Sequence, residues 1–440
     1  MTQSPQAPTA SPRSVTLLVI VAALGYFVDL YDLVLFGVVR IPSLKSLGLQ
    51  GEELTNVGLH LLNWQMAGML LGGFAWGILG DKRGRLSVLY GSILTYSLAN
   101  LANAFVHDVD TYAALRFIAG FGLAGELGAG ITLVMESMPA KSRGWGTTVI
   151  ATFGVLGGAT AAAVTEYVGA GFHATATLID QVAGSQLAAS AIATDDWRGA
   201  YVVGGLLGLI LLAARFSLAE SHIFTKLRDE QHQRGSLLML FSNFDRVKRL
   251  GSAVALGLPI WFVAGILVPF CPEFGQHAGM TELPSPAKAI FWFYVGLTFG
   301  DLGSGILSQA FKNRVVIIAL FIVATASLIA AYFGAAPMTL DRFYGLIFGL
   351  GITCGYWALF MTSAAENFGT NLRATVTTAI PNLVRSAVIP MTLTFKALRD
   401  GGLEIDDAAL GLGAFTCLLA VLALVPLRET FGKTLDYVEE

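Results

Sequence analysis

The sequence predicts an all-α membrane protein of twelve transmembrane helices in two pseudo-symmetric six-helix bundles. The 440-residue chain is 55% hydrophobic and only 13% charged, whereas soluble globular proteins carry about 25% charged residues. Twelve apolar runs are each long enough to cross a bilayer, which takes about twenty residues of helix. In addition, motifs in the first half of the chain recur at matching positions in the second half.

The apolar runs divide evenly around a polar stretch near the middle of the chain. Residues 1–14 are polar and Pro-rich, so we expect a disordered cytoplasmic tail. We expect an N-terminal bundle over 15–218, a cytoplasmic central loop over 219–250, a C-terminal bundle over 251–428 and a cytoplasmic tail over 429–440. The spans are expected near residues 15–39, 57–79, 87–106, 111–136, 146–170, 198–218, 251–272, 288–310, 315–336, 342–364, 374–397 and 406–427.

The distribution of Lys and Arg predicts the orientation, because cytoplasmic loops are enriched in these residues. With the N-terminus inside, eighteen of the 27 Lys and Arg fall in cytoplasmic loops and tails, and seven fall in outer loops. Arg116 and Arg385 remain within the spans. We therefore expect an integral membrane protein with both termini in the cytoplasm, located in the cell (inner) membrane of a bacterium.

Short motifs recur at the same topological point of each half. Segment 136–143 (ESMPAKSR) follows the fourth span and segment 366–373 (ENFGTNLR) follows the tenth. Segment 77–85 (GILGDKRGR) follows the second span and segment 305–314 (GILSQAFKNR) follows the eighth. Duplicated six-helix halves are typical of secondary transporters, whose substrate site lies between the halves near the membrane midplane.

These motifs resemble those of the major facilitator superfamily. Segment 77–85 is similar to the signature loop between its second and third helices. Segments 29–32 (DLYD) and 116–126 (RFIAGFGLAGE) resemble the first-helix and fourth-helix motifs of its metabolite/proton symporters. Segments 218–221 (LAES) and 428–432 (RETFG) resemble the tags that close each half in sugar-porter-like members.

The resemblance implies a secondary active transporter that moves a small metabolite by proton symport and alternating access. We expect the substrate to be an organic anion. A proton-coupled sugar or polyol porter and an efflux antiporter remain as alternatives. The sequence departs from the family pattern at Gln309, which stands where the acid of the first-half signature loop would repeat.

Ionisable residues within the spans are candidates for proton coupling, because a charge at mid-bilayer costs at least about 2.5–3.5 kcal/mol. Asp29 and Asp32 are three residues apart in the first span and share a helix face. The resemblance implies that Asp32 and Arg116 form the proton site, with Asp29 as the rival carrier. Glu126 either lines the edge of the cavity or bonds a neighbouring helix. The alternative for the two acids of the first span is simple pairing with another helix.

A second group of residues is assigned to substrate binding. Arg385 lies near the centre of the eleventh span, and with Asn382 it resembles the Asn-x-x-Arg pattern of organic-acid porters. We interpret Arg385 as the anchor for a carboxylate, because its guanidinium offers a bidentate fork. The alternative is a structural pair with Asp301. Further candidates for substrate contact, with packing as the alternative, are Gln65, Tyr356 and Trp357.

Charged residues at the cytoplasmic ends of spans are expected to form a gate. We expect Asp81 to cap the N-terminus of the eleventh span, where the helix dipole stabilises an anion. The inner latch of the first half is expected to comprise Asp81, Arg85, Glu136 and Arg143. The gating residues expected in the second half are Glu366, Arg373 and Asp301.

Composition argues against other classes of function. A net charge of −3 gives no support for nucleic-acid binding. The three cysteines and six histidines lack metal-ligand spacing, so we expect neither a metal nor another cofactor. A membrane enzyme would need a cluster of acids and histidines or a nucleophile beside a base, and a sensor that has lost transport would not need Asp32 and Arg116. We expect a monomer whose partners are the lipid bilayer, a small-molecule substrate and protons.

We predict from the charge distribution that the C-terminus is cytoplasmic. Green fluorescent protein fused after Glu440 should fluoresce, because it folds in the cytoplasm, and alkaline phosphatase fused at the same residue should be inactive. The reverse pair of results would contradict the topology of twelve spans with both termini inside.

Overall fold

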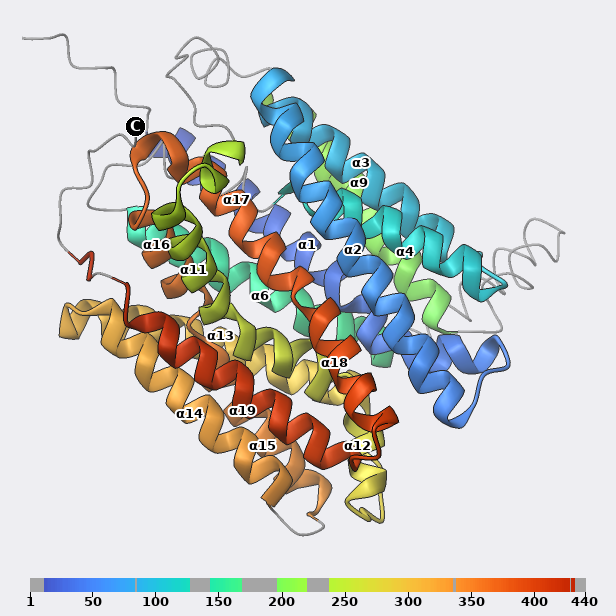
Figure 1. Ribbon diagram of the computed structural model, residues 1–440. Coiled ribbons are helices and arrows are strands. Elements are labelled where there is room, and N and C mark those ends of the chain that lie inside the picture. The colour runs from blue at the N-terminus through green and yellow to red at the C-terminus, as the bar shows by residue number, and fades with distance from the viewer. Residues whose placement is uncertain are drawn as a thin grey trace, which may run out of the picture.

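The chain folds into a bundle of long helices (Figure 1). The computed structural model describes residues 12–83, 85–126, 143–167, 196–219, 237–334, 338–427 and 429–431. Every regular element among these residues is a helix. The prediction of an all-α protein is confirmed.

Six long helices make up the described part of the N-terminal half. They are α1 (Pro12–Ser46), α2 (Gly51–Arg83), α3 (Arg85–Asn103), α4 (Val109–Leu123), α6 (Arg143–Tyr167) and α9 (Asp196–Ala219). The helix α1 packs mainly against α6, α2 against α4, and α3 against both α4 and α9. Each of the six falls on one predicted span, and α1 and α2 extend past the predicted ends.

The C-terminal half contains more elements, because three of its predicted spans are broken. Its elements are the 3₁₀ helix η1 (Leu237–Phe241), α11 (Phe244–Phe262), the π-helical turn η2 (Val263–Leu267), α12 (Cys271–His277), α13 (Pro286–Phe311), α14 (Arg314–Gly334), α15 (Leu340–Cys354), α16 (Trp357–Glu366), α17 (Thr370–Ser386), α18 (Val388–Asp400) and α19 (Ile405–Leu424). The breaks fall in the seventh, tenth and eleventh predicted spans. Irregular backbone at membrane depth is tolerated where protein surrounds it or where it lines a cavity.

A proline lies at one of these breaks and a glycine at another. In the seventh span, Pro259 lies inside α11 just before the π-helical turn and lacks the N–H that a regular helix needs. In the tenth span, α13 approaches the chain closely at Gly355. A Cβ atom added to Gly355 would lie 2.3 Å from the Cα atom of Gly300, so this approach requires a glycine.

The same kind of helix contact recurs at equivalent spans of the two halves. A Cβ added to Gly68 of α2 would lie 2.0 Å from the carbonyl oxygen of Phe117 in α4. A Cβ added to Gly296 of α13 would lie 2.2 Å from the carbonyl oxygen of Phe348 in α15. Small residues permit such close approach in lipid. The second and fourth spans thus pack as the eighth and tenth do, in agreement with the predicted pseudo-symmetry.

Eight helices within the described residues are long and apolar enough to cross a membrane on their own. Large apolar side chains are exposed along them, for example Ile210 on α9, Phe299 on α13 and Leu320 on α14. Such side chains suit a surface that faces lipid. Figure 1 shows α1, α6, α11 and α17 between the outer helices of the two halves. These central helices carry the candidate site.

A buried ion pair joins the two halves at the end of the bundle where α1 ends and α2 begins. Arg40 of α1 is 1% exposed and lies 2.7 Å from Glu273 of α12 through Nη1. Its Nη2 donates to the same carboxylate and to the carbonyl oxygen of Pro269, both at 3.0 Å. Thr55 of α2 also donates to Glu273, at 3.3 Å. In the predicted topology this end faces the outside.

Two exposed ion pairs also join the halves at the same end. Arg399 of α18 lies 3.0 Å from Glu52 of α2, whose side chain is 84% exposed. Lys288 of α13 lies 3.7 Å from Glu166 of α6. The two halves are therefore held together at this end in the present conformation.

We predict that Glu273→Gln opens this end of the protein. The change leaves Arg40 buried without a counter-charge, which costs about 3–5 kcal/mol, so conformers that are open here become more populated. Electron paramagnetic resonance distances between spin labels at Ser46→Cys and Glu282→Cys should lengthen. The control is Glu52→Gln, which removes an exposed pair worth about 0–1 kcal/mol. Identical distance distributions in the two variants would refute the prediction.

Candidate functional site

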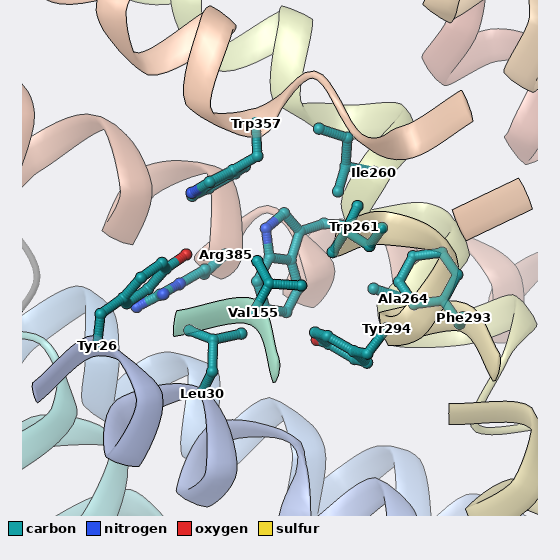
Figure 2. A pocket seen from close by; sticks show the side chains of 11 residues that line it. Tyr26, Leu30, Val155, Ile260, Trp261, Ala264, Phe293, Tyr294, Trp357 and Arg385 are labelled. Carbon is teal, nitrogen blue, oxygen red and sulfur yellow. The ribbon is translucent and has the colours of Figure 1, made fainter. Parts of the chain in front are cut away.

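A small cavity lies between the two halves (Figure 2). Its lining residues are Tyr26, Leu30, Val155, Ile260, Trp261, Ala264, Phe293, Tyr294, Leu297, Trp357 and Arg385. They come from α1 and α6 of the N-terminal half and from α11, η2, α13, α16 and α17 of the C-terminal half. The cavity volume of about 20 Å³ leaves room for about one water molecule. The side chains of the two halves leave only this small space between them in this conformation.

Aromatic side chains dominate the lining. Figure 2 shows Tyr26, Trp261, Tyr294 and Trp357 surrounding a common space. The rings of Trp261 and Trp357 meet edge to face, with their centroids 6.5 Å apart. Gly158 of α6 admits the ring of Tyr294, since a Cβ at this position would lie 2.6 Å from the ring. An aromatic enclosure of this kind suits a flat, largely apolar group.

Arg385 is the one charged residue of the lining, and it pairs with Asp29. Its Nη2 donates to Oδ2 of Asp29 at 3.3 Å, and the two side chains are 1% and 0% exposed. The pair connects α17 with α1, so it bridges the two halves. From the sequence, we expected Asp29 to take part in proton coupling and Arg385 in substrate binding.

Both members of this pair keep unused hydrogen-bonding atoms. The Nε and Nη1 atoms of Arg385 and the Oδ1 atom of Asp29 are buried and have no hydrogen-bond partner among the residues that the structure describes. The guanidinium carbon of Arg385 also lies 5.9 Å from the ring centroid of Trp261. A guanidinium with two free donor nitrogens at the wall of a cavity can donate hydrogen bonds to a carboxylate and bind it.

Asp301 does not pair with Arg385, contrary to the alternative interpretation of that arginine. It lies buried on α13 beside the break in the tenth span. Its Oδ1 accepts a hydrogen bond from the backbone N–H of Ala358 at 3.2 Å, in the first turn of α16. An anion at a helix N-terminus is stabilised by the N–H groups that the helix leaves free. The structure thus places Asp301 at this helix start within the C-terminal half.

Asp32 and Arg116 lie near each other without forming a direct ion pair. Arg116 donates to Asn100 at 2.7 Å and to Asn103 at 3.2 Å, and its guanidinium lies 4.7 Å from the ring centroid of Tyr201. Its charge is within electrostatic range of Asp32. Both oxygens of Asp32 are buried and lack a hydrogen-bond partner in the described part of the chain. The two residues assigned to the proton site are thus neighbours, with asparagines bound to the arginine.

Glu126, just beyond the end of α4, forms a buried ion pair with Arg215 of α9. Sequence reasoning gave no role to Arg215, although this residue falls inside the sixth predicted span. Arg215 lies within α9 and is 7% exposed. The available signal was its place inside the apolar end of the sixth span, opposite an acid at the inner end of the fourth.

Among the residues assigned to substrate contact, Trp357 lines the cavity and three others bond to backbone. Gln65 donates to the carbonyl oxygen of Leu33 at 3.1 Å. Asn382 donates to that of Ala124 at 2.9 Å, and Tyr356 donates to that of Leu256 at 2.9 Å. These three side chains hold helices together and are absent from the cavity lining. Sequence reasoning missed the other lining residues, among them Tyr26, Trp261 and Tyr294.

The expected gate is described only in part. Glu366 at the end of α16 forms an ion pair with Arg314 of α14 and accepts a hydrogen bond from Thr430 at 2.7 Å. Glu136 lies outside the described residues. The side chains of Asp81, Arg85, Arg143 and Arg373 also lie outside the part that the structure describes, so the inner latch stays a prediction.

Comparison with known proteins identifies a family. The family model described as Major Facilitator Superfamily matches residues 22–390. A putative metabolite transport protein of Haemophilus influenzae is 25% identical, over 94% of this chain and 96% of that protein. A gentisate transporter of Corynebacterium glutamicum is 25% identical, over 92% of this chain and 86% of that protein. The fold is similar to that of the proton:xylose symporter XylE of E. coli, with a TM-score of 0.69 at 15% identity over 97% of this chain and 98% of that one.

Proposed function

The chain belongs to the major facilitator superfamily and is an integral membrane transporter rather than an enzyme, and from this premise we propose that it carries a monocyclic aromatic carboxylate together with a proton. Transport occurs by alternating access of the cavity between the two halves. In this mechanism the transporter is a single chain in a bacterial membrane, with both termini in the cytoplasm.

The observation that carries this proposal is an arginine set in an aromatic cavity. Arg385 offers two unpartnered nitrogens for a carboxylate, while Trp261 and Trp357 offer ring faces and edges for an aromatic ring. A bidentate guanidinium–carboxylate contact is stronger than a neutral hydrogen bond. Aromatic pairs add about 0.5–1.5 kcal/mol beyond buried area. The gentisate transporter, a relative named for an aromatic acid, supports this substrate class.

The cavity volume supports a mechanism in which the halves separate to admit the substrate. Pockets for small molecules measure about 300–1,000 Å³, whereas this cavity measures about 20 Å³. The ion pair of Arg40 with Glu273 closes one end of the interface between the halves. Substrate must therefore enter a more open conformer than the one described, and the closed conformer is the state without cargo.

The pair between Asp29 and Arg385 supplies the coupling to a proton. When Asp29 is ionised, it occupies the guanidinium that the substrate carboxylate needs. A proton on Asp29 removes the negative charge and releases Arg385 for the substrate. Proton and substrate therefore bind cooperatively, and the coupling is reciprocal. This assigns the coupling proton to Asp29, the rival of Asp32 in the sequence-based interpretation.

We predict that Arg385→Gln abolishes the preference for a carboxylate. With gentisate as the probe and its uncharged amide, 2,5-dihydroxybenzamide, as the comparison, the wild type should bind the acid more tightly. Loss of a buried charge partner costs about 2–5 kcal/mol, so the variant should bind gentisate at least about 30-fold more weakly. Its affinity for the amide should change little. Calorimetry on purified protein measures both ligands, and equal losses for acid and amide would argue against a carboxylate anchor.

We predict that Asp29→Asn removes the pH dependence of binding and uphill accumulation. In the wild type, affinity for gentisate should fall as pH rises, because ionised Asp29 then holds Arg385. The asparagine of the variant carries no charge at any pH, so affinity should stay high and exchange down a gradient should continue. Asp32→Asn is the matched control, since Asp32 makes no ion pair with Arg385 and its variant should keep pH-dependent affinity. If only Asp32→Asn makes affinity independent of pH, the coupling acid is Asp32.

A further inference from the structure

Two glycines of α6 lie against the tyrosines of the substrate cavity. Gly154 and Gly158 are four residues apart, which places them on one face of the helix. A Cβ atom added to Gly154 would lie 2.0 Å from Cδ1 of Tyr26. A Cβ atom added to Gly158 would lie 2.6 Å from Cδ1 of Tyr294. Carbon atoms in contact are about 3.5–4.0 Å apart, so neither glycine has room for a side chain while the rings are there.

The contact of Tyr294 differs from that of Tyr26, because it joins the two halves. Tyr26 belongs to α1, which lies with α6 in the N-terminal half, whereas Tyr294 belongs to α13 of the C-terminal half. A Cβ on Gly158 would lie 2.6–2.8 Å from three atoms of the Tyr294 ring. The ring therefore covers Gly158 from the opposite half, and any movement of α13 relative to α6 changes this contact.

The ring of Tyr294 separates Gly158 from the cavity. Val155 of α6 lines the cavity, whereas Gly158, three residues further along the same face, does not. Tyr294 both lines the cavity and lies over Gly158. Figure 2 shows its ring across the shared space from Trp357. If this ring turned away, the cavity would extend onto the bare backbone of α6 and gain the space of one six-membered ring.

The cavity is too small for an aromatic acid in the described conformation. It measures about 20 Å³, while an engineered protein cavity that binds benzene measures about 150 Å³. A substrate ring therefore needs space that a side chain now fills. The ring of Tyr294 fills a space of the required shape, at the wall of the same cavity as Arg385. A carboxylate bound to the two unpartnered nitrogens of Arg385 would place its ring in this cavity.

We propose that the backbone of α6 at Gly158 binds the substrate ring and that the ring of Tyr294 covers this surface in the empty protein. When cargo binds, Tyr294 turns off Gly158 and the substrate ring takes its place. The uncovered space accommodates one six-membered ring, so Gly158 and Tyr294 limit the cargo to monocyclic acids. The carboxylate of Asp29 occupies Arg385 in the same conformation. The empty protein thus fills both the carboxylate position and the ring position with its own side chains.

This inference rests on the proposed transport of an aromatic carboxylate and names the residues that select its size. The test compares gentisate with 1,4-dihydroxy-2-naphthoate, which is gentisate with a second ring fused to it, by calorimetry on purified protein. Wild type should bind the bicyclic acid at least about tenfold more weakly, since one methylene group in a closed pocket already changes specificity by about 10–200-fold. Tyr294→Ala should lose this preference, because the missing ring leaves space for the second ring. Tyr294→Phe is the matched control, since it keeps the ring and should keep the preference.

Gly158→Ala in the Tyr294→Ala background tests the binding surface itself. The added methyl group then meets no tyrosine ring, so a role of Gly158 in packing alone predicts unchanged binding. The proposal predicts that the double variant binds both acids about tenfold more weakly than Tyr294→Ala, because the methyl group occupies the ring position.

The outcomes separate this inference from the proposed function. An undiminished preference for gentisate in Tyr294→Ala, or unchanged binding in the double variant, would overturn the roles of Gly158 and Tyr294 and leave the proposed function standing. If wild type binds neither acid, the proposed function fails and this inference fails with it.

Discussion

The ion pair between Asp29 and Arg385 is the interaction on which the rest of the site depends. It is fully buried and joins the two halves at the cavity wall. A buried ion pair adds little net stability, because removing two charges from water costs about as much as their attraction returns. Breaking it without replacement costs about 3–5 kcal/mol, since one charge is then left uncompensated. In the proposed mechanism the pair is a switch, which holds the halves together until Asp29 binds a proton and Arg385 binds the substrate carboxylate.

In the proposed mechanism, this constraint couples the movement of the substrate to that of a proton. A proton alone would neutralise Asp29 and leave Arg385 as a lone buried cation. A substrate anion alone would occupy Arg385 and leave Asp29 as a lone buried anion beside it. Only proton and anion together leave every buried charge compensated. In the proposed mechanism the symport stoichiometry follows from this charge balance, and it needs no other coupling device.

The two halves carry different kinds of buried side chain. The N-terminal half holds buried acids beside cations, in Asp32 with Arg116 and in Glu126 with Arg215. The C-terminal half supplies Arg385 and most of the aromatic lining. In the proposed mechanism, relative movement of the halves brings the proton-binding acids and the substrate-binding residues into or out of contact. The helix breaks in the C-terminal half are what place Trp357 and Arg385 at the wall, because both residues lie within four positions of a break.

Sequence alone predicted the fold and the charged members of the site, because both depend on local composition. An apolar run of span length is recognised wherever it occurs, and a charge within it is conspicuous, as Asp29 and Arg385 were. The partners of these charges could not be predicted, because each ion pair joins residues far apart in the chain. Arg385 pairs with Asp29, which lies more than 350 positions earlier in the chain. Asp301 accepts a hydrogen bond at the start of α16, just after the break at Gly355.

The roles of aromatic and small residues could not be predicted from the sequence for a different reason. Tryptophan and tyrosine in membrane helices serve as packing, as interfacial anchors or as site walls, and composition does not separate these roles. Trp261 lines the cavity and lies between Pro259 and the π-helical turn. Glycines are equally ambiguous. Gly68 permits close contact between two helices, whereas Gly204 makes room for the carboxylate of Asp32. Glycine thus permits helix packing at one position and makes room for a buried carboxylate at another. The neighbouring residue in the folded structure decides between these roles.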